Sequence, residues 1–183
     1  IESCRFTPEG FEQEIEATEV PDDTEEEEEE VDLSLTLDSL RYSWELWARS
    51  EQIAPPGNWN TWLLMAGRGC GKSRTGAEWA RAQAMESPGS HGALVAPTSA
   101  DARDVMVKTL LSCVPESEGI RYEPSKRGLV WCNGSTATLY SAEEPDRLRG
   151  PQHHWAWCDE IAAWQYAEEV WDMLQMTMRL GDH

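Results

Sequence analysis

The feature that most constrains this chain is the segment Ala66–Ser73, which reads Ala-Gly-Arg-Gly-Cys-Gly-Lys-Ser. An apolar run, Trp62–Met65, precedes it and is expected to form a buried strand, and an alanine-rich helical pattern starts at Lys72. A glycine-rich turn between a strand and a helix aims successive backbone N–H groups and the positive end of the helix dipole at one point. The segment therefore predicts a phosphate-binding loop. The usual pattern begins with Gly, whereas this chain has Ala66.

Each polar position of this loop has an expected task. Lys72 is expected to reach the β- and γ-phosphates of ATP, and Ser73 to hold Mg²⁺. Arg68 is expected to touch the γ-phosphate, although a solvated loop arginine is nearly as good an interpretation. The expected nucleotide-contacting positions are Gly67, Gly69, Cys70, Gly71, Lys72, Ser73 and Arg74. The glycines allow the backbone to approach a phosphate closely.

Hydrolysis also needs an acid that supports the metal and a group that aligns the attacking water. Asp159 and Glu160 follow the apolar run Trp155–Cys158, which is expected to be a strand. In open α/β sheets the carboxyl ends of strands face the ligand crevice. We therefore expect Asp159 to be a metal ligand and Glu160 to polarise the water. Two solvated acids that cap a helix are the alternative interpretation.

Three further side chains are weaker candidates. Arg147 and Arg149 precede the strand that leads to Asp159, and an arginine there could stabilise charge during phosphoryl transfer, in cis or from a neighbouring subunit. A structural salt bridge is an equally good interpretation of either. Gln52 could read an adenine edge with its amide, while His153 and His154 are interpreted as structural.

The net charge of −19 is concentrated in one part of the chain. Residues 1–40 hold 16 of the 34 acidic residues and one of the 15 basic residues, so the remainder, with 18 acids and 14 bases, carries only −4. We expect residues 1–33 to be an acidic, disordered tail. The five cysteines show no C-x-x-C spacing, which argues against zinc and disulfides and favours a reducing cytosol.

The remainder, residues 34–183, alternates helical and strand patterns. Helices are expected over about 34–50, 72–86, 98–111 and 164–180, the third opened by a Thr98–Asp101 capping signature. Strands are expected at 62–65, 92–97, 129–132, 136–140 and 155–158. Asn133-Gly134 predicts a hairpin with a type I′ turn. The pattern predicts an α/β fold with a mostly parallel sheet flanked by helices.

In this order the motifs resemble the ATPase domain of the large terminase subunit of tailed DNA bacteriophages. The resemblance covers about residues 40–183 and suggests that the domain is cut short at its C-terminal end. Its residues are Trp47-Ala48-Arg49, Gln52, Pro55-Pro56, Trp59–Leu64, Ala66–Ser73, Gly76–Trp79, Leu94–Thr98, Asn133–Ser135, Leu148–Pro151 and Trp157–Glu160.

This resemblance implies an additional-strand P-loop NTPase fold and a motor that drives double-stranded viral DNA into a procapsid, in the host cell cytoplasm. It implies ATP and Mg²⁺, a portal protein and a small terminase subunit as partners, and a homo-oligomeric ring, commonly a pentamer. It assigns adenine recognition to Gln52 and action across the subunit interface to Arg149. No nuclease activity is expected from this chain.

Two alternatives stay open on the sequence alone. A nucleic-acid helicase carries the same order of glutamine, phosphate loop and Asp-Glu pair, but adds a second motor domain. A nucleotide-binding fragment without turnover is the other alternative.

Overall fold

The structure is a computed structural model that describes residue 37 and residues 40–181. The chain divides into two units, Ile1–Val31 and Asp32–His183, and every described residue belongs to the second. The expected tail, residues 1–33, lies outside the described residues. No helix in the described part of the chain is long and apolar enough to cross a membrane.

A five-stranded sheet in the order β2-β3-β4-β1-β5 organises the fold. Its strands are β1 (His91–Ala96), β2 (Arg121–Glu123), β3 (Gly128–Val130), β4 (Thr136–Ser141) and β5 (Trp155–Cys158). β1 runs parallel to both β4 and β5, whereas β2 and β3 pair antiparallel with their neighbours. The expected α/β architecture is confirmed, but the sheet is mixed and not mostly parallel, because two of its four strand pairings are parallel and two are antiparallel. The sequence patterns do not predict the short edge strand β2.

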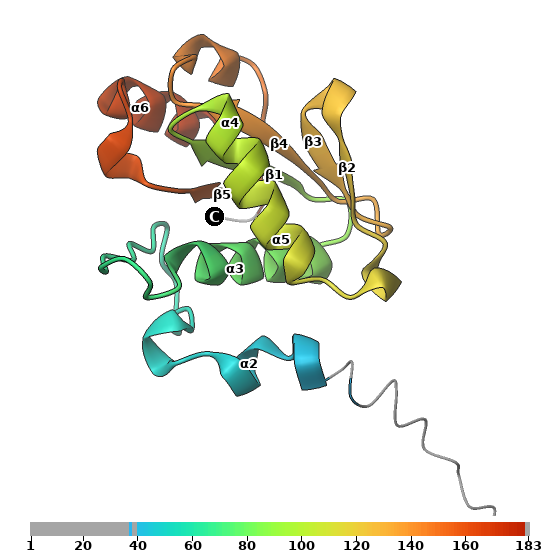
Figure 1. The fold of residues 1–183 in the computed structure, drawn as a ribbon. Helices are drawn as coiled ribbons and strands as arrows, with labels where there is room; N and C mark the ends of the chain where they lie inside the picture. The colour runs from blue at the N-terminus through green and yellow to red at the C-terminus, as the bar shows by residue number, and fades with distance from the viewer. Residues whose placement is uncertain (1–36, 38–39, 182–183) are drawn as a thin grey trace, which may run out of the picture. The chain divides into compact units, whose positions relative to one another are not determined.

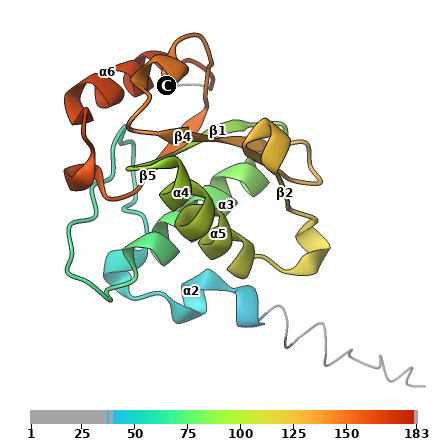
Figure 2. The same ribbon diagram turned by 45° about the horizontal axis from the view of Figure 1, so that its top comes forward.

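Helices cover both faces of the sheet (Figures 1 and 2). The α-helices are α2 (Trp44–Trp47), α3 (Lys72–Glu86), α4 (Ser99–Asp101), α5 (Lys108–Ser112) and α6 (Ala167–Thr177), and a π-helical segment, η2 (Ala102–Val107), joins α4 to α5. Short 3-10 helices are η1 (Ser50–Gln52), η3 (Glu116–Glu118), η4 (Pro124–Lys126), η5 (Pro145–Leu148) and η6 (Ile161–Ala163).

Each face of the sheet has its own apolar core. One core joins α3, η2 and α5 to the sheet through fully buried residues such as Ala80, Leu94 and Met106. The other joins α6 and η5 to the opposite face through Val95, Leu148 and Leu174. Leu94 and Val95 are adjacent in β1 and serve opposite faces, as the two-residue period of a strand requires. Figure 2 shows α6 on one side of the sheet and α3 and α5 on the other.

The expected strand at 62–65 is wrong. These residues form neither strand nor helix, and Leu63 and Met65 are 65% and 83% exposed. Tryptophan contacts hold the segment away from the sheet. The ring of Trp62 lies 6.2 Å from the ring of Trp59, and the ring of Trp59 lies 6.3 Å from that of Trp79 in α3. The segment therefore packs its aromatic side chain toward α3 instead of pairing with the sheet.

The expected helix over 34–50 is confirmed only in part, because residues 40–42 and 44–47 are helical, but the helix is interrupted at Ser43 and α2 ends at Trp47. Arg81 of α3 donates to the carbonyl oxygen of Tyr42 at 3.0 Å. A continuous helix would use that carbonyl for the N–H of Leu46, which donates to the Ser43 oxygen instead. A contact with another helix thus overrides the helical pattern of this segment.

The strands β3 and β4 are joined by a loop with a different turn from the expected type I′. That turn needs positive φ at both central residues. Among the described residues other than glycine, only Arg127 and Glu160 have positive φ, so Asn133 does not supply it. Instead Gly134 has φ 85°, and its N–H donates to the Trp131 oxygen. Asn133 Nδ2 donates to the Ala84 oxygen at 2.8 Å, which fastens the loop to the end of α3.

The last helix is shorter than expected, since α6 ends at Thr177 although Gly181 has φ 102°. The chain after Thr177 pairs with His153 instead of continuing the helix. The His153 N–H donates to the Thr177 oxygen at 2.8 Å, and the Leu180 N–H donates to the His153 oxygen at 3.2 Å. These bonds divert the backbone before the glycine is reached.

Candidate nucleotide-binding site

The predicted phosphate loop leads directly into α3, whose first residue is Lys72. Gly69 and Gly71 have φ of 76° and 86°, the left-handed region in which a side chain is disfavoured. An added Cβ at Gly67 or Gly69 would meet no atom within 4 Å, so this part of the loop faces open space. A glycine loop at the start of a 15-residue helix presents free N–H groups and a positive dipole end to an anion. The backbone therefore suits a phosphate group.

The Lys72 side chain folds back from the start of α3 onto the loop. Its ammonium donates to the carbonyl oxygens of Ala66 and Gly67 at 3.0 and 3.3 Å. The same nitrogen lies 3.8 Å from a carboxylate oxygen of Glu160. The lysine side chain is 25% exposed, so its charge remains accessible at the mouth of the loop. The positive charge and the Glu160 carboxylate thus face one another across the site.

Ser73 and Asp159, which are 86 positions apart in the sequence, meet at the end of β5. The Ser73 hydroxyl donates to the Asp159 carboxylate at 3.2 Å. Asp159 is 8% exposed, and burial raises the pKa of its carboxyl, while the Ser73 bond opposes that rise. The backbone of Asp159 is fixed on both sides, because its N–H donates to the Val95 oxygen and its carbonyl accepts from the Trp164 indole at 3.0 Å. The carboxylate is therefore held in one place.

Glu160 has an unusual backbone conformation, with φ 50° and ψ 47°. Left-handed geometry costs a residue other than glycine about 1–3 kcal/mol and tends to occur at functional sites. The side chain is 57% exposed and points back to Lys72 across the 3.8 Å contact. This strained position turns the carboxylate toward the loop and leaves it accessible to water.

Gln52 lies against the loop with its amide already engaged. Its Nε2 donates to the Cys70 oxygen at 3.3 Å and to the Thr75 hydroxyl at 3.1 Å, and its Oε1 accepts from the Arg49 N–H at 3.1 Å. The Arg49 guanidinium also donates to the Cys70 oxygen. The sequence patterns predict no role for Arg49 or Thr75. The one sequence feature that could have pointed to Thr75 is its position three residues after Lys72.

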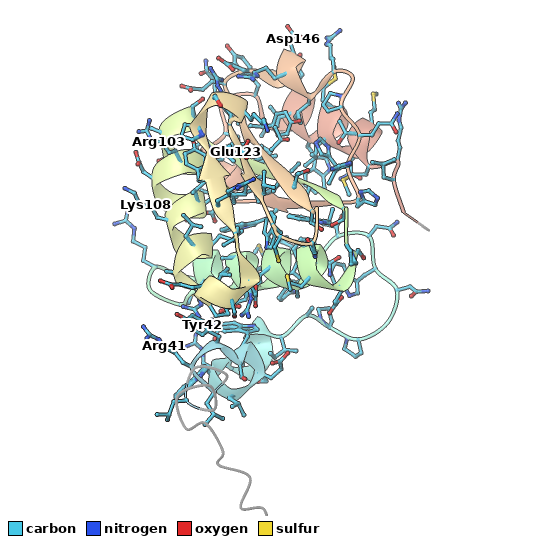
Figure 3. The ribbon with its side chains drawn as sticks, turned by 90° about the vertical axis from the view of Figure 1, so that its right-hand side faces the viewer. Arg41, Tyr42, Arg103, Lys108, Glu123 and Asp146 are labelled. Carbon is cyan, nitrogen blue, oxygen red and sulfur yellow. The ribbon has the colours of Figure 1, made fainter. Side chains whose placement is uncertain are left out.

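Two of the other candidate arginines, Arg74 and Arg149, are engaged in ion pairs with neighbouring acids. Arg74 pairs with the buried Glu78 at 2.6 Å and lies over the ring of Trp44. Arg149 is 61% exposed and pairs with Asp146 at 2.7 Å. Figure 3 shows Asp146 at the end of the molecule opposite Tyr42, and Arg68 is an exposed loop residue. The structure thus brings Gln52, Lys72, Ser73, Asp159 and Glu160 together, and shows no such grouping for these arginines.

The chemistry of the paired side chains suits a magnesium ion. Residue 37 and residues 40–181 contain no group of three or more His, Cys, Asp and Glu side chains that could hold a metal. Mg²⁺ at phosphate sites does not need one, because it takes one or two protein oxygens, several waters and phosphate oxygens. The Ser73 hydroxyl and the buried Asp159 carboxylate are oxygen ligands of this kind, and they already lie side by side.

Comparison with known proteins gives two results. The family model for the N-terminal part of T4likevirus-type large terminase subunits matches residues 63–183. The large terminase ATPase domain of Thermus phage P74-26 is 22% identical with a TM-score of 0.46, over 60% of this chain and 53% of that chain. An arginine-to-alanine mutant of that domain is 21% identical with the same TM-score, over 61% and 53%.

The chain spans about half the length of these two solved structures (53%). No curated protein matches the sequence. The family match is the informative result, because it extends over most of the chain and includes the phosphate loop and the Asp159-Glu160 pair. This chain therefore belongs to the T4likevirus-type family of large terminase subunits, of which it carries the N-terminal part.

Proposed function

We propose that this chain is an ATP-hydrolysing motor domain that powers translocation of double-stranded viral DNA into a procapsid. The single observation that carries the proposal is the meeting of Ser73 with Asp159 and of Lys72 with Glu160 at the start of α3. This grouping supplies a phosphate-binding lysine, two oxygen ligands for a metal and an accessible carboxylate. These are the parts that phosphoryl transfer to water requires.

Each residue has one task in the proposed reaction. Lys72 and the N–H groups of the loop bind the phosphates of ATP, while Ser73 and Asp159 hold Mg²⁺. Mg²⁺, when bound, neutralises charge on the triphosphate. Glu160 orients a water molecule and accepts its proton. Before ATP binds, the contact with Glu160 holds the Lys72 ammonium at the mouth of the loop. A bound triphosphate then replaces Glu160 as the partner of the ammonium.

The family supports the wider role. A large terminase subunit packages DNA with a portal protein and a small terminase subunit, and we extend that role, the homo-oligomeric ring and the host cytoplasm to this chain as part of the proposal. Membership of the family also favours the packaging motor over the helicase alternative.

Two variants test the proposal, with ATP affinity and phosphate release measured in the presence of Mg²⁺. Lys72→Ala removes a charge-assisted contact of about 1.5–3 kcal/mol, so ATP should bind roughly ten- to a hundredfold more weakly. Glu160→Gln should bind ATP like the parent and release no phosphate. If the parent releases phosphate, release at the same rate by the Glu160→Gln variant would reject the proposed role of the carboxylate.

The third possibility, a nucleotide-binding fragment without turnover, gives a different result in the same assays. It would bind ATP through Lys72 yet release no phosphate in either the parent or the Glu160→Gln variant. Absence of ATP binding by the parent chain would reject the nucleotide site itself.

A further inference from the structure

We propose that Arg49 and Gln52 brace the phosphate loop through the carbonyl group of Cys70, so that Gln52 supports triphosphate binding and does not read the base. The inference rests on the proposed function, since it concerns the same nucleotide site. It assigns a positioning role to Arg49 and replaces the expected adenine contact of Gln52.

Two donors from the segment before the loop converge on one loop oxygen. The Arg49 guanidinium and the Gln52 amide both donate to the Cys70 carbonyl, the second at 3.3 Å. The Arg49 N–H in turn donates to the Gln52 Oε1 at 3.1 Å, which fixes the amide. These bonds turn the Cys70 oxygen toward Arg49 and Gln52. The N–H of the same peptide unit, which belongs to Gly71, points in the opposite direction, where it can donate to an anion. The pair therefore orients the loop for phosphate.

The brace extends into the first turns of α3. Gln52 Nε2 donates to the Thr75 hydroxyl at 3.1 Å, and that hydroxyl donates to the Gly71 oxygen at 3.0 Å. A Cβ added at Gly71 would lie 2.6 Å from Gln52 Nε2, so the loop backbone is packed directly against the amide. The loop is held at Cys70 and Gly71, on either side of the peptide bond that joins them.

The donor count of the amide argues against base recognition. Bidentate contact with an adenine needs one free N–H of the amide and its oxygen. The Gln52 NH₂ group has two hydrogens, and both are used, one on Cys70 and one on Thr75. The side chain is also only 8% exposed. An adenine contact would have to break a bond that holds the loop.

A triphosphate without a base distinguishes between support of the phosphate loop and recognition of the adenine by Gln52. Binding of ATP, GTP and inorganic tripolyphosphate to Gln52→Ala should be measured by calorimetry in Mg²⁺. The loss of the two hydrogen bonds that Gln52 donates to Cys70 and Thr75 predicts an affinity about tenfold lower, by the same factor for all three probes. A loss confined to ATP, with GTP and tripolyphosphate bound as by the parent, would overturn the inference in favour of base reading.

Variants of Arg49 test the inference independently. Arg49→Ala should weaken all three probes by a common factor, and Arg49→Lys, which keeps one donor, should recover part of the loss. Arg103→Ala is the matched control, because Arg103 is an exposed arginine that pairs with Asp104 and points outward in Figure 3. Binding by Arg49→Ala equal to that of this control would overturn the role of Arg49.

Thermal unfolding of each variant shows whether weaker binding results from a loss of fold. A more conservative substitution, Thr75→Val, tests the same hydrogen bonds with less risk to the fold. Thr75→Val keeps the shape of the side chain, removes the hydroxyl that Gln52 and Gly71 share, and should lower the affinity for all three probes. Unchanged tripolyphosphate affinity in folded Thr75→Val would count against the extension of the brace into α3. A parent chain that binds none of the probes would instead reject the proposed function.

Discussion

Gly76 of α3 lies directly against the indole of Trp157 of β5. A Cβ added at Gly76 would come within 2.2 Å of the Trp157 ring nitrogen, closer than such atoms approach in real proteins. The close packing brings the first turn of the helix to the end of the strand. Ser73 lies one turn before Gly76 and Asp159 lies two residues after Trp157, so this contact sets the distance between the two proposed metal ligands.

The first prediction concerns Gly76→Ala. In an exposed helix this change stabilises by about 1 kcal/mol, because alanine favours the helix. Here overpacking against Trp157 should destabilise the domain by about 1–3 kcal/mol and weaken Mg²⁺-dependent ATP binding. Urea unfolding gives the sign of the change in the free energy of unfolding. A more stable Gly76→Ala variant would show that the helix and the strand are not in close contact.

The second prediction concerns the dependence of stability on pH. His153 is 2% exposed, and its ring bonds the Thr177 hydroxyl at 2.8 Å and the Tyr140 hydroxyl at 3.2 Å. Burial, and then the neighbouring His91 and His154, lower its pKa from 6.5 to about 4. Between pH 4 and pH 6.5 the imidazole of His153 is therefore protonated in the unfolded state and neutral in the folded state. Stability from this group is complete above pH 6.5 and declines as the pH falls toward 4.

At roughly 1.4 kcal/mol per pKa unit, this effect amounts to about 2 kcal/mol between pH 7 and pH 5. His153→Gln removes the titrating group and keeps hydrogen-bonding capacity. Its free energy of unfolding, from urea titrations at both pH values, should fall less than that of the parent. Parallel losses in the two proteins would show that His153 does not carry this pH dependence.

The third prediction concerns Arg149. Its partner Asp146 is 83% exposed, and exposed ion pairs contribute only about 0–1 kcal/mol. Arg149→Ala should therefore leave the melting temperature nearly unchanged. If Arg149 acts across a subunit interface, the variant should bind ATP normally and hydrolyse it more slowly.

Dilution separates action in trans from action in cis. Turnover per subunit of the parent should fall on dilution, whereas the residual turnover of Arg149→Ala should change little. Turnover that is independent of concentration in the parent would show that each subunit works alone.

Local sequence patterns predicted the middle of the fold well. The strand β1 and the helix α3 are continuous patterns with glycine or proline close to each end, β5 is a continuous apolar run, and the packing of all three follows from their own apolar residues. Thr98 accepts the Asp101 N–H at 3.1 Å, as the capping signature predicted. The approach of Ser73 to Asp159 also follows from local rules, because a loop before a helix and an acid after a strand both lie at the carboxyl edge of the sheet.

Partners distant in the sequence decided the features that the patterns missed. The helical pattern at 34–50 did not reveal that Arg81 would take the carbonyl of Tyr42. An apolar run at 62–65 looks like a strand, but pairing depends on a neighbouring strand, and Trp62 contacts Trp59 instead. The sequence suggests that Gln52 could read an adenine edge, because no pattern shows that Cys70 and Thr75 accept the hydrogen bonds of its amide.

A double-mutant cycle on Ser73 and Asp159 tests the central claim most directly. The measured quantity is the factor by which Mg²⁺ tightens ATP binding, in the parent, in Ser73→Ala, in Asp159→Asn and in the double variant. If both residues hold one ion, each single change should lower this factor. The factor in the double variant should then be only slightly lower than in the single variant with the larger loss. Losses that multiply in the double variant, or an unchanged factor in Asp159→Asn, would contradict a shared magnesium site.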